Sequence, residues 1–350
     1  MNRKIRVLVA EDSMTVRKHL CAVLETDPDL EVVGEASNGK EAIHLCQARR
    51  PDVITMDMMM PTMSGLAATE YIMAHCPTPI LVVSSSTNRG EIFKTYEALA
   101  AGAVEVLEKP KGDDSDSSWE RQFLSTVKLV SRIHVITHIR ARLPTPAATA
   151  PKPFDGSAIR AAATTSHKLV AIGASTGGPA AIVSLLRGLP APFALPILLV
   201  LHINEPFGSA FAEWLDGQTR HRVAFAKDRE TLKSAAGRVV MAPPDRHLAI
   251  EADHLRLLAD PPRHSCRPSV DVLFESVART CGAEAVACLL TGMGRDGAEG
   301  LLKIRESGGF TIAQDQASCV VYGMPREAVL LNAATQVLPL DDIAPVLASL

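Results

Sequence analysis

The stretch IRVLVAEDS at residues 5–13 joins a mostly apolar six-residue run to two acidic residues and a serine. Four further apolar runs follow before residue 110, and a stretch with helical spacing of apolar residues succeeds each of them: residues 31–36, 52–57, 80–84 and 104–107. Alternating strands and helices are typical of a parallel sheet that is covered on both faces. The sequence therefore predicts a doubly wound α/β domain in this half of the chain.

The same alternation resumes at Lys168, with helical stretches between the apolar runs at residues 168–173, 197–202, 222–227, 238–243, 285–291 and 310–315. Residues 247–258 alternate instead with a period of two around Ala252 and Asp253, which predicts an antiparallel hairpin. We therefore expect a second α/β domain, Rossmann-like, with a mainly parallel sheet and one antiparallel hairpin.

A change of composition separates the two halves. Residues 141–166 contain four prolines and eight alanines and little that could form a core, which is typical of a semi-extended linker. Residues 119–138 have apolar side chains near helical spacing, and we expect this helix to close the first domain. The predicted organisation is a first domain at residues 1–140, a linker at 141–166 and a second domain at 167–350.

Composition argues against several functional classes. The chain has 36 basic and 39 acidic residues and a net charge of -3, so no long-range field would attract nucleic acid or anionic lipid. Its seven cysteines include no Cys-x-x-Cys pair, which argues against a disulfide framework or a thiolate zinc site. The first apolar run is too short for a signal peptide, and no later run approaches about 20 apolar residues. We expect a cytoplasmic protein without nucleic-acid partners or direct membrane insertion.

The first domain carries polar residues where its strands end: Glu11, Asp12, Asp57, Ser84 and Lys109. In doubly wound sheets the ligand crevice lies beyond the carboxyl ends of the strands, so these side chains are expected to meet. Clustered carboxylates favour Mg²⁺, which prefers oxygen ligands and keeps positions for water and phosphate. Each residue alone is explained as well by a loop cap, but five in register favour a site for phosphoryl transfer, with Asp57 as the acceptor.

A second set of polar residues follows the strands of the second domain. Residues 173–177 match G-x-S-x-G, which places the Ser175 hydroxyl on a sharp turn between a strand and a helix. Glycine and serine are common in such turns for steric reasons, so this match alone is weak. His202 ends the run at 197–202, and Asp296 follows the run at 285–291. A serine nucleophile needs a base and the base needs an acid that orients it, and all three are expected at one sheet edge.

Several alternatives stay open at this point. Residues 292–297 also match G-x-G-x-x-G, with Asp315 downstream, as in dinucleotide-binding proteins. Their late position and the ionisable residue inside the glycine turn argue against that interpretation. Arg267 and Asp271 either line the substrate cleft or cap a helix. The chain could also be a phosphorylation-controlled binding module whose serine, histidine and aspartate are idle.

The first domain resembles the receiver domain of response regulators over its whole length, through the motifs IRVLVAEDS, DVITMDMMMPTMSG, ILVVSSS and VLEKP. The resemblance implies a flavodoxin-like fold, with Mg²⁺ held by Glu11, Asp12 and Asp57. It also implies phosphorylation of Asp57 by a histidine kinase, with Ser84 and Lys109 contacting the phosphate. One departure is Val106, which stands where receivers usually have Phe or Tyr.

The second domain resembles the catalytic domain of chemotaxis protein-glutamate methylesterases, through the motifs GASTGGP, LHIN, APPDRHL, RPSVDVLF, LLTGMGRDGAEGL and AQDQASCVVYGMP. The resemblance implies that Ser175 is the nucleophile, His202 the base and Asp296 the orienting acid. It makes backbone N–H groups near Thr176 and Met293 candidate oxyanion donors. No cofactor is expected in this domain.

With both domains together, the resemblance implies a phosphorylation-activated enzyme of chemotaxis adaptation. Its expected substrates are methylated glutamates of chemoreceptors, and its phosphodonor is a chemotaxis histidine kinase. Deamidation of receptor glutamine would use the same acyl chemistry with ammonia as the leaving group. The unphosphorylated receiver is expected to cover the catalytic cleft, and the chain is expected to act as a monomer.

Overall fold

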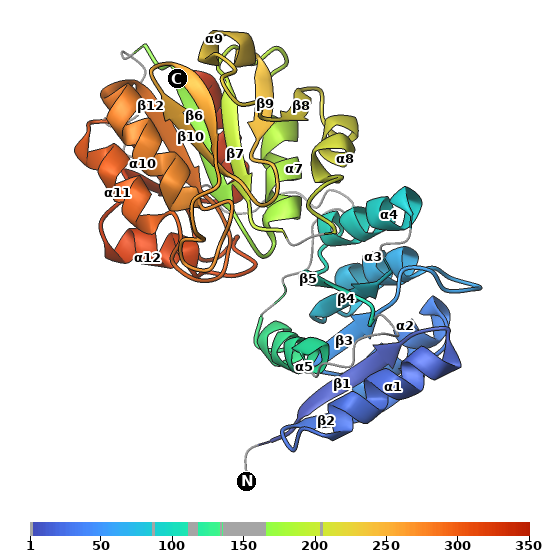
Figure 1. The fold of residues 1–350 in the computed structure, drawn as a ribbon. Helices are drawn as coiled ribbons and strands as arrows, with labels where there is room; N and C mark the ends of the chain where they lie inside the picture. Colours follow the sequence, from blue (N-terminus) through green and yellow to red (C-terminus); the bar gives the residue numbers. More distant parts are fainter. Residues whose placement is uncertain (1–2, 86–87, 111–117, 134, 136–165, 204–205) are drawn as a thin grey trace, which may run out of the picture. The chain divides into compact units, whose positions relative to one another are not determined.

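The computed structural model describes residues 3–85, 88–110, 118–133, 135, 166–203 and 206–350, and it divides into two compact units, Met1–Pro146 and Ala147–Leu350 (Figure 1). The predicted linker lies outside the described residues except for Ser166. No helix within these described ranges is long and apolar enough to cross a membrane.

The N-terminal unit is a five-stranded parallel sheet with the strand order β2-β1-β3-β4-β5. The strands are β1 (Ile5–Ala10), β2 (Leu30–Ala36), β3 (Val53–Met56), β4 (Ile80–Ser84) and β5 (Glu105–Glu108). The helices are α1 (Met14–Glu25), α2 (Gly39–Arg49), α3 (Gly65–His75), α4 (Arg89–Ala100) and α5 (Ser118–Val130). Helix α1 contacts α5, whereas α3 contacts both α2 and α4, so helices cover both faces of the sheet. This order and layering confirm the doubly wound prediction.

The helix predicted at residues 119–138 is shorter than expected. Helix α5 ends at Val130, and residues 131–132 form a turn, while residues 134 and 136–138 lie outside the described residues. The Ile133 N–H donates to the Val130 carbonyl, three residues back, which tightens the last turn. Beyond Lys128 the sequence becomes rich in β-branched residues, which lose rotamer freedom in a helix.

The C-terminal unit is a seven-stranded sheet with the order β14-β13-β12-β6-β7-β9-β8, and its neighbouring strands are parallel. The strands are β6 (Leu169–Ala174), β7 (Ile197–Leu201), β8 (Arg222–Phe225), β9 (Arg238–Met241), β12 (Ala285–Leu289), β13 (Phe310–Gln314) and β14 (Gln336–Leu338). The helices are α7 (Gly178–Gly188), α8 (Phe211–Gln218), α9 (Leu232–Ala235), α10 (Val270–Cys281), α11 (Ala298–Glu306), α12 (Met324–Leu330) and α13 (Leu340–Ser349). Neither β14 nor α13 was among the elements expected from the sequence.

Two layers of helices enclose this sheet. Helix α10 contacts α11, and α11 contacts α12, on the face opposite to the contacting pair α7 and α13 (Figure 1). The largest side chain in the core under α10 is Phe274, which is fully buried. This core fixes the N-terminus of α10 against the carboxyl ends of the central strands.

The predicted antiparallel hairpin is confirmed as β10 (His247–Glu251) and β11 (His254–Leu258). Its two connecting residues, Ala252 and Asp253, have φ angles of 46° and 64°. Positive φ at both central residues is what a tight two-residue hairpin turn requires, because it matches the twist of the flanking strands. The hairpin packs on α10 and so supports that helix from outside the main sheet.

Candidate active site and phosphorylation site

Ser175 and His202 follow two neighbouring parallel strands. Ala174, the last residue of β6, pairs with Leu201, the last residue of β7, so the next residues leave the sheet side by side. The His202 N–H donates to the Ala174 carbonyl at 3.0 Å, which continues the ladder by one bond. This register is the reason that two residues 27 positions apart reach the same edge.

Close backbone packing holds the turn that carries Ser175. The Ser175 N–H donates to the Thr291 carbonyl at 3.0 Å. A Cβ atom at Gly292 would lie 2.8 Å from Ser175 Cβ, so only glycine permits this approach. Gly177 has a φ of 77° and precedes α7. The loop after β12 is therefore locked against the serine turn.

Asp296 lies in the loop between β12 and α11, and its side chain is 3% exposed. Its Oδ1 accepts hydrogen bonds from Ser269 Oγ at 2.7 Å and the Asp271 N–H at 3.1 Å. Its Oδ2 accepts from the Val270 N–H at 2.7 Å. These donors belong to the N-terminus of α10, where a negative charge is favoured. The carboxylate is thus held in place by groups other than the histidine.

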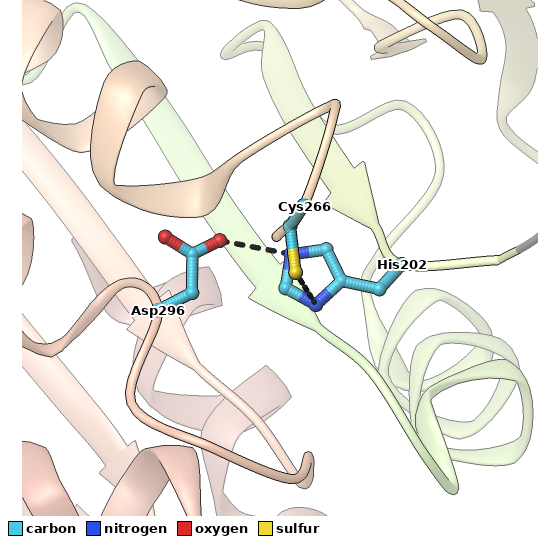
Figure 2. A group of neighbouring side chains, drawn as sticks. All are labelled: His202, Cys266 and Asp296. Atoms are coloured by element: carbon cyan, nitrogen blue, oxygen red, sulfur yellow. Dashed lines mark hydrogen bonds and ion pairs between the residues drawn. The ribbon is translucent and has the colours of Figure 1, made fainter. Parts of the chain in front are cut away.

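His202 contacts a different group through each ring nitrogen (Figure 2). Nε2 lies 2.9 Å from Asp296 Oδ2, and Nδ1 lies 3.7 Å from the Cys266 sulfur. With a proton on Nε2 directed at the carboxylate, the neutral ring keeps its lone pair on Nδ1. Nδ1 is therefore the nitrogen that can accept a proton. In the part of the chain that the structure describes, no hydrogen bond joins the Ser175 hydroxyl to His202.

The two charged partners shift each other's pKa values in opposite directions. Burial alone would lower the pKa of His202, but Asp296 and Cys266 raise it to about 9. Burial alone would raise the pKa of Asp296, but His202, Ser269 and the Val270 N–H hold it below its ordinary value. Below about pH 9 the resting pair is therefore an imidazolium and a carboxylate.

A raised histidine pKa predicts a steep pH profile for any reaction in which His202 acts as a base. Only the neutral ring accepts a proton, and well below the pKa its fraction rises about tenfold per pH unit. We expect kcat/KM for ester hydrolysis to rise with that slope from about pH 6 to about pH 8. The measurement is methanol release across that range, and a flat profile would contradict the raised pKa in the free enzyme.

The predicted acidic residues of the N-terminal unit do come together. One ligand oxygen each of Glu11, Asp12 and Asp57 lies within 4.8 Å of the others. Lys109 Nζ lies 2.9 Å from Glu11 Oε2 and 3.0 Å from Asp57 Oδ1. Ser84 ends the adjacent strand β4, and its carbonyl accepts from the Lys109 N–H at 3.0 Å. The site combines three carboxylates and one ammonium group, and Ser84 lies at the end of the adjacent strand.

These residues fit a hard divalent cation. Asp57 Oδ2 is buried and has no hydrogen-bond partner among the described residues. This carboxylate oxygen is therefore available to bind a metal ion. Burial raises the pKa of Asp57, and Lys109 only partly offsets this. The pKa of Glu11 is also raised, by burial and by the Asp57 charge. A cation would relieve this repulsion, so the donor set suits Mg²⁺.

The comparison with known proteins covers both units. The CheB methylesterase family matches residues 170–347, and the response regulator receiver domain family matches residues 7–115. The chain belongs to the CheB methylesterase family. A relative in Nitrosospira multiformis, named protein-glutamate methylesterase/protein-glutamine glutaminase, is 42% identical over 99% of this chain and 97% of its own length. One from Anaeromyxobacter dehalogenans with the same name, numbered 3, is 45% identical over 98% of each chain.

A solved structure agrees with the fold of the C-terminal unit. The CheB methylesterase catalytic domain of Thermotoga maritima is 35% identical and has a TM-score of 0.50. It covers 53% of this chain and 98% of its own length. The predicted Rossmann-like domain and the predicted receiver domain are thereby confirmed as the two folds of a CheB methylesterase.

One candidate oxyanion donor follows Ser175 in the chain, and the other belongs to the loop that packs on Ser175. Thr176 follows Ser175 directly, and the Thr176 carbonyl accepts from Thr291 Oγ1 at 3.0 Å, which fixes the peptide after the candidate N–H. Met293 follows Gly292 in the loop packed on Ser175, and its side chain is 51% exposed. The Met293 N–H donates to no other described residue. Both assignments remain predictions that this placement allows.

The dinucleotide alternative finds no support in the same loop. Gly294 and Gly297 have φ angles of 88° and 93°, so both glycines serve the turn. Asp296 is directed at His202 and α10, as described above. Asp315 accepts from the Ser318 N–H and from Ser318 Oγ, at 2.9 and 2.6 Å, and so caps its own loop.

The structure also shows the contacts of Arg267 and Asp271, whose roles the sequence left open, and of two residues that were not predicted. Arg267 pairs with Asp245. Asp271 is fully buried in the first turn of α10, where its Oδ1 accepts from the Gly300 N–H at 2.7 Å. Its role is therefore to join α10 to α11. Ser269 is the N-cap of α10, and a serine before an apolar helical run was the available signal. Cys266 carried no such signal.

Proposed function

We propose that this CheB methylesterase hydrolyses the γ-methyl esters of glutamate side chains on chemoreceptors and that phosphorylation of Asp57 activates it. The observation that carries the proposal is the alignment of Ser175 with His202 at adjacent strand ends, with Asp296 on the far nitrogen of the ring. The names of its curated relatives support the substrate. We further propose that it acts as a monomer in the cytoplasm.

Hydrolysis would proceed through an acyl-enzyme. Ser175 Oγ attacks the ester carbonyl while its proton moves to His202 Nδ1, and the carbonyl π electrons move to the oxygen. The N–H groups of Thr176 and Met293 would stabilise this oxyanion, and a single such donor is worth on the order of 10²- to 10³-fold in rate. Collapse of the intermediate breaks the bond to the methoxy group, and His202 protonates the departing methanol.

Water completes the cycle by the same steps. It attacks the acyl carbonyl as His202 takes one of its protons, and the proton then returns to Ser175 Oγ as glutamate leaves. Asp296 stays ionised throughout, because its hydrogen bonds from α10 favour the charged form. Glutamine would react by the same route, with ammonia in place of methanol, which fits the second half of the relatives' name.

The receiver domain supplies the proposed control. Glu11, Asp12 and Asp57 would hold Mg²⁺, which would neutralise charge on the transferring phosphoryl group. Lys109, whose Nζ is 3.0 Å from Asp57 Oδ1, would contact the new phosphate oxygens, and the hydroxyl of Ser84 at the adjacent strand end would do the same. A histidine kinase of the chemotaxis system would be the phosphodonor. We propose that the unphosphorylated receiver restrains the esterase and that phosphate removes this restraint.

Methanol release from methylated chemoreceptor tests this control. With Mg²⁺ and a small phosphodonor such as acetyl phosphate, we expect the rate of the intact chain to rise about tenfold or more, which corresponds to about 1.4 kcal/mol. The Asp57→Asn variant should show no rise, because it lacks the acceptor carboxylate. Asp52→Asn is a matched control, because Asp52 lies outside the acidic group and bonds Arg3 and the Arg6 N–H.

Two outcomes would contradict parts of the proposal. A phosphodonor effect that persists in Asp57→Asn would place the control at another residue. Methanol release that is absent from every sample, while Asp57 still becomes phosphorylated, would leave a phosphorylation-controlled binding module in place of an esterase.

A further inference from the structure

The Cys266 thiol is set apart from the other cysteines of the chain. All seven cysteines lie within the described residues, and six of them are buried. Cys266 is half-buried in the segment that leads into α10. Its sulfur lies 3.7 Å from His202 Nδ1 and 3.5 Å from the His264 carbonyl, to which the thiol can donate. A half-buried cysteine therefore faces Nδ1, the ring nitrogen whose lone pair is free when the histidine is neutral.

The spacing of sulfur and nitrogen suits a tetrahedral metal ion. Zinc binds thiolate at about 2.3 Å and imidazole at about 2.0–2.1 Å, so two such ligands lie roughly 3.6 Å apart. The observed 3.7 Å separation needs almost no rearrangement. Thiolate and imidazole together also select zinc over Mg²⁺, which prefers oxygen ligands.

Asp296 completes the arrangement from the other side of the ring (Figure 2). Its carboxylate holds Nε2 at 2.9 Å and so directs the lone pair of Nδ1 toward Cys266. A carboxylate on the distal nitrogen is the usual support for a metal-binding histidine, because it fixes the ring and raises its basicity. One ligand atom each of His202, Cys266 and Asp296 lies within 4.8 Å of the others.

We propose that Cys266 Sγ and His202 Nδ1 form an inhibitory Zn²⁺ site, with Asp296 supporting the ring and water filling the remaining positions. Binding releases the thiol proton and, below about pH 9, the proton on Nδ1 as well. It then engages the nitrogen lone pair that the esterase needs for the Ser175 proton. The inhibitory effect rests on the proposed function, whereas binding of the ion does not. The absence of a Cys-x-x-Cys pair argued against a thiolate zinc site. That argument considers only ligands close together in the sequence, whereas the fold brings His202 to Cys266 from a distant strand.

A neighbouring group of possible ligands is less suitable. His264, Asp271 and Glu299 also offer atoms within 4.8 Å of one another. The Arg263 guanidinium, however, lies 3.2 Å from Glu299 and 3.9 Å from Asp271. A positive charge therefore already pairs with these two carboxylates. His264 Nε2 contacts Asp271 at 3.1 Å. This group serves as the comparison site in the test.

The first experiment is alkylation of the full chain by iodoacetamide with and without Zn²⁺, followed by peptide mass spectrometry. Excess Mg²⁺ is present throughout to occupy the acidic site of the receiver. We expect native protein to be alkylated at Cys266 before the six buried cysteines, and Zn²⁺ to slow that reaction at least tenfold. Unchanged alkylation of Cys266 in saturating Zn²⁺ would overturn the proposal, whether or not the chain is an esterase.

Variants then locate the ion. In competition with a chromophoric chelator, Cys266→Ser and His202→Gln should each weaken Zn²⁺ binding by about 10- to 100-fold or more. His264→Asn should leave the affinity unchanged, and asparagine tolerates the φ of 50° at this position. Loss of binding in His264→Asn with retention in Cys266→Ser would place the ion at the neighbouring group and refute the proposal.

Inhibition is measured last, as methanol release relative to each protein's own zinc-free rate. The unmodified chain should lose at least tenfold of its rate in saturating Zn²⁺, and a chelator should restore it. Cys266→Ser should need at least tenfold more Zn²⁺ for half inhibition. Full activity with Zn²⁺ demonstrably bound at Cys266 would refute the inhibitory role alone.

Discussion

The Ser175→Ala variant is expected to lose methanol release from methylated chemoreceptor by on the order of 10³- to 10⁶-fold in kcat/KM. The reason is that the hydroxyl forms the covalent intermediate, and binding together with oxyanion stabilisation cannot replace it. The remaining rate would come from direct attack by water in the same cleft. The measurement is methanol release by the intact chain and the variant at equal concentration, with phosphodonor present.

A matched serine variant separates chemistry from folding. Ser209→Ala removes an exposed hydroxyl whose one hydrogen bond among the described residues goes to the Pro206 carbonyl, and it should keep full activity. Ser175→Ala itself should keep the Tm of the wild type, because the backbone N–H of Ser175, not its hydroxyl, bonds Thr291. A Ser175→Ala chain that retained more than about a tenth of the activity would remove Ser175 as the nucleophile.

The residues at the carboxyl edge of each parallel sheet could be predicted, because their position depends only on where the strands end. The apolar runs that end before Ser175 and at His202 placed both residues at a carboxyl edge, and the observed register pairs the residues just before them. Asp296 needed one more step, since it lies seven residues after β12 and only its loop could be predicted. Strand boundaries thus carry most of the information about which polar residues meet.

The orientation of the histidine ring could not be predicted in this way. It depends on the N-terminus of α10, which fixes Asp296, and on the path of the segment that carries Cys266. That path includes His264 and Ser265 at φ angles of 50° and 63°, a conformation that is usually signalled by glycine or asparagine. Neither residue is a glycine or an asparagine, so no sequence pattern predicts that the Cys266 thiol lies beside His202.

The spacing of apolar residues predicted the hairpin correctly but placed the end of α5 too late, for related reasons. Two strands in period two leave only Ala252 and Asp253 between them, so the turn is determined by the strands. The end of α5 has no such constraint, because apolar spacing continues past Val130 while the hydrogen bonding changes to a tight turn. Apolar spacing reports which face is buried, not where the helical hydrogen bonds stop.

The Asp296→Asn variant is expected to lower kcat/KM by on the order of 10⁴-fold, although the side chain keeps its size. An amide NH₂ facing His202 Nε2 would donate a hydrogen bond to that nitrogen, so the neutral ring would carry its own proton on Nδ1. Nδ1 could then no longer accept the Ser175 proton. The pKa of His202 should also fall, because the carboxylate that raises it is gone.

Asp296 also accepts hydrogen bonds from the start of α10, so the variant needs a control for that second role. Ser269→Ala removes one of these bonds and the N-cap while keeping the carboxylate, and a cap of this kind is worth about 1 kcal/mol of stability. If Asp296 orients the base, Ser269→Ala should lower the Tm but leave the activity within about tenfold at a temperature where it is folded. Equal losses of activity in the two variants, matched by equal losses of Tm, would mean that Asp296 serves α10 and that His202 is oriented by other groups.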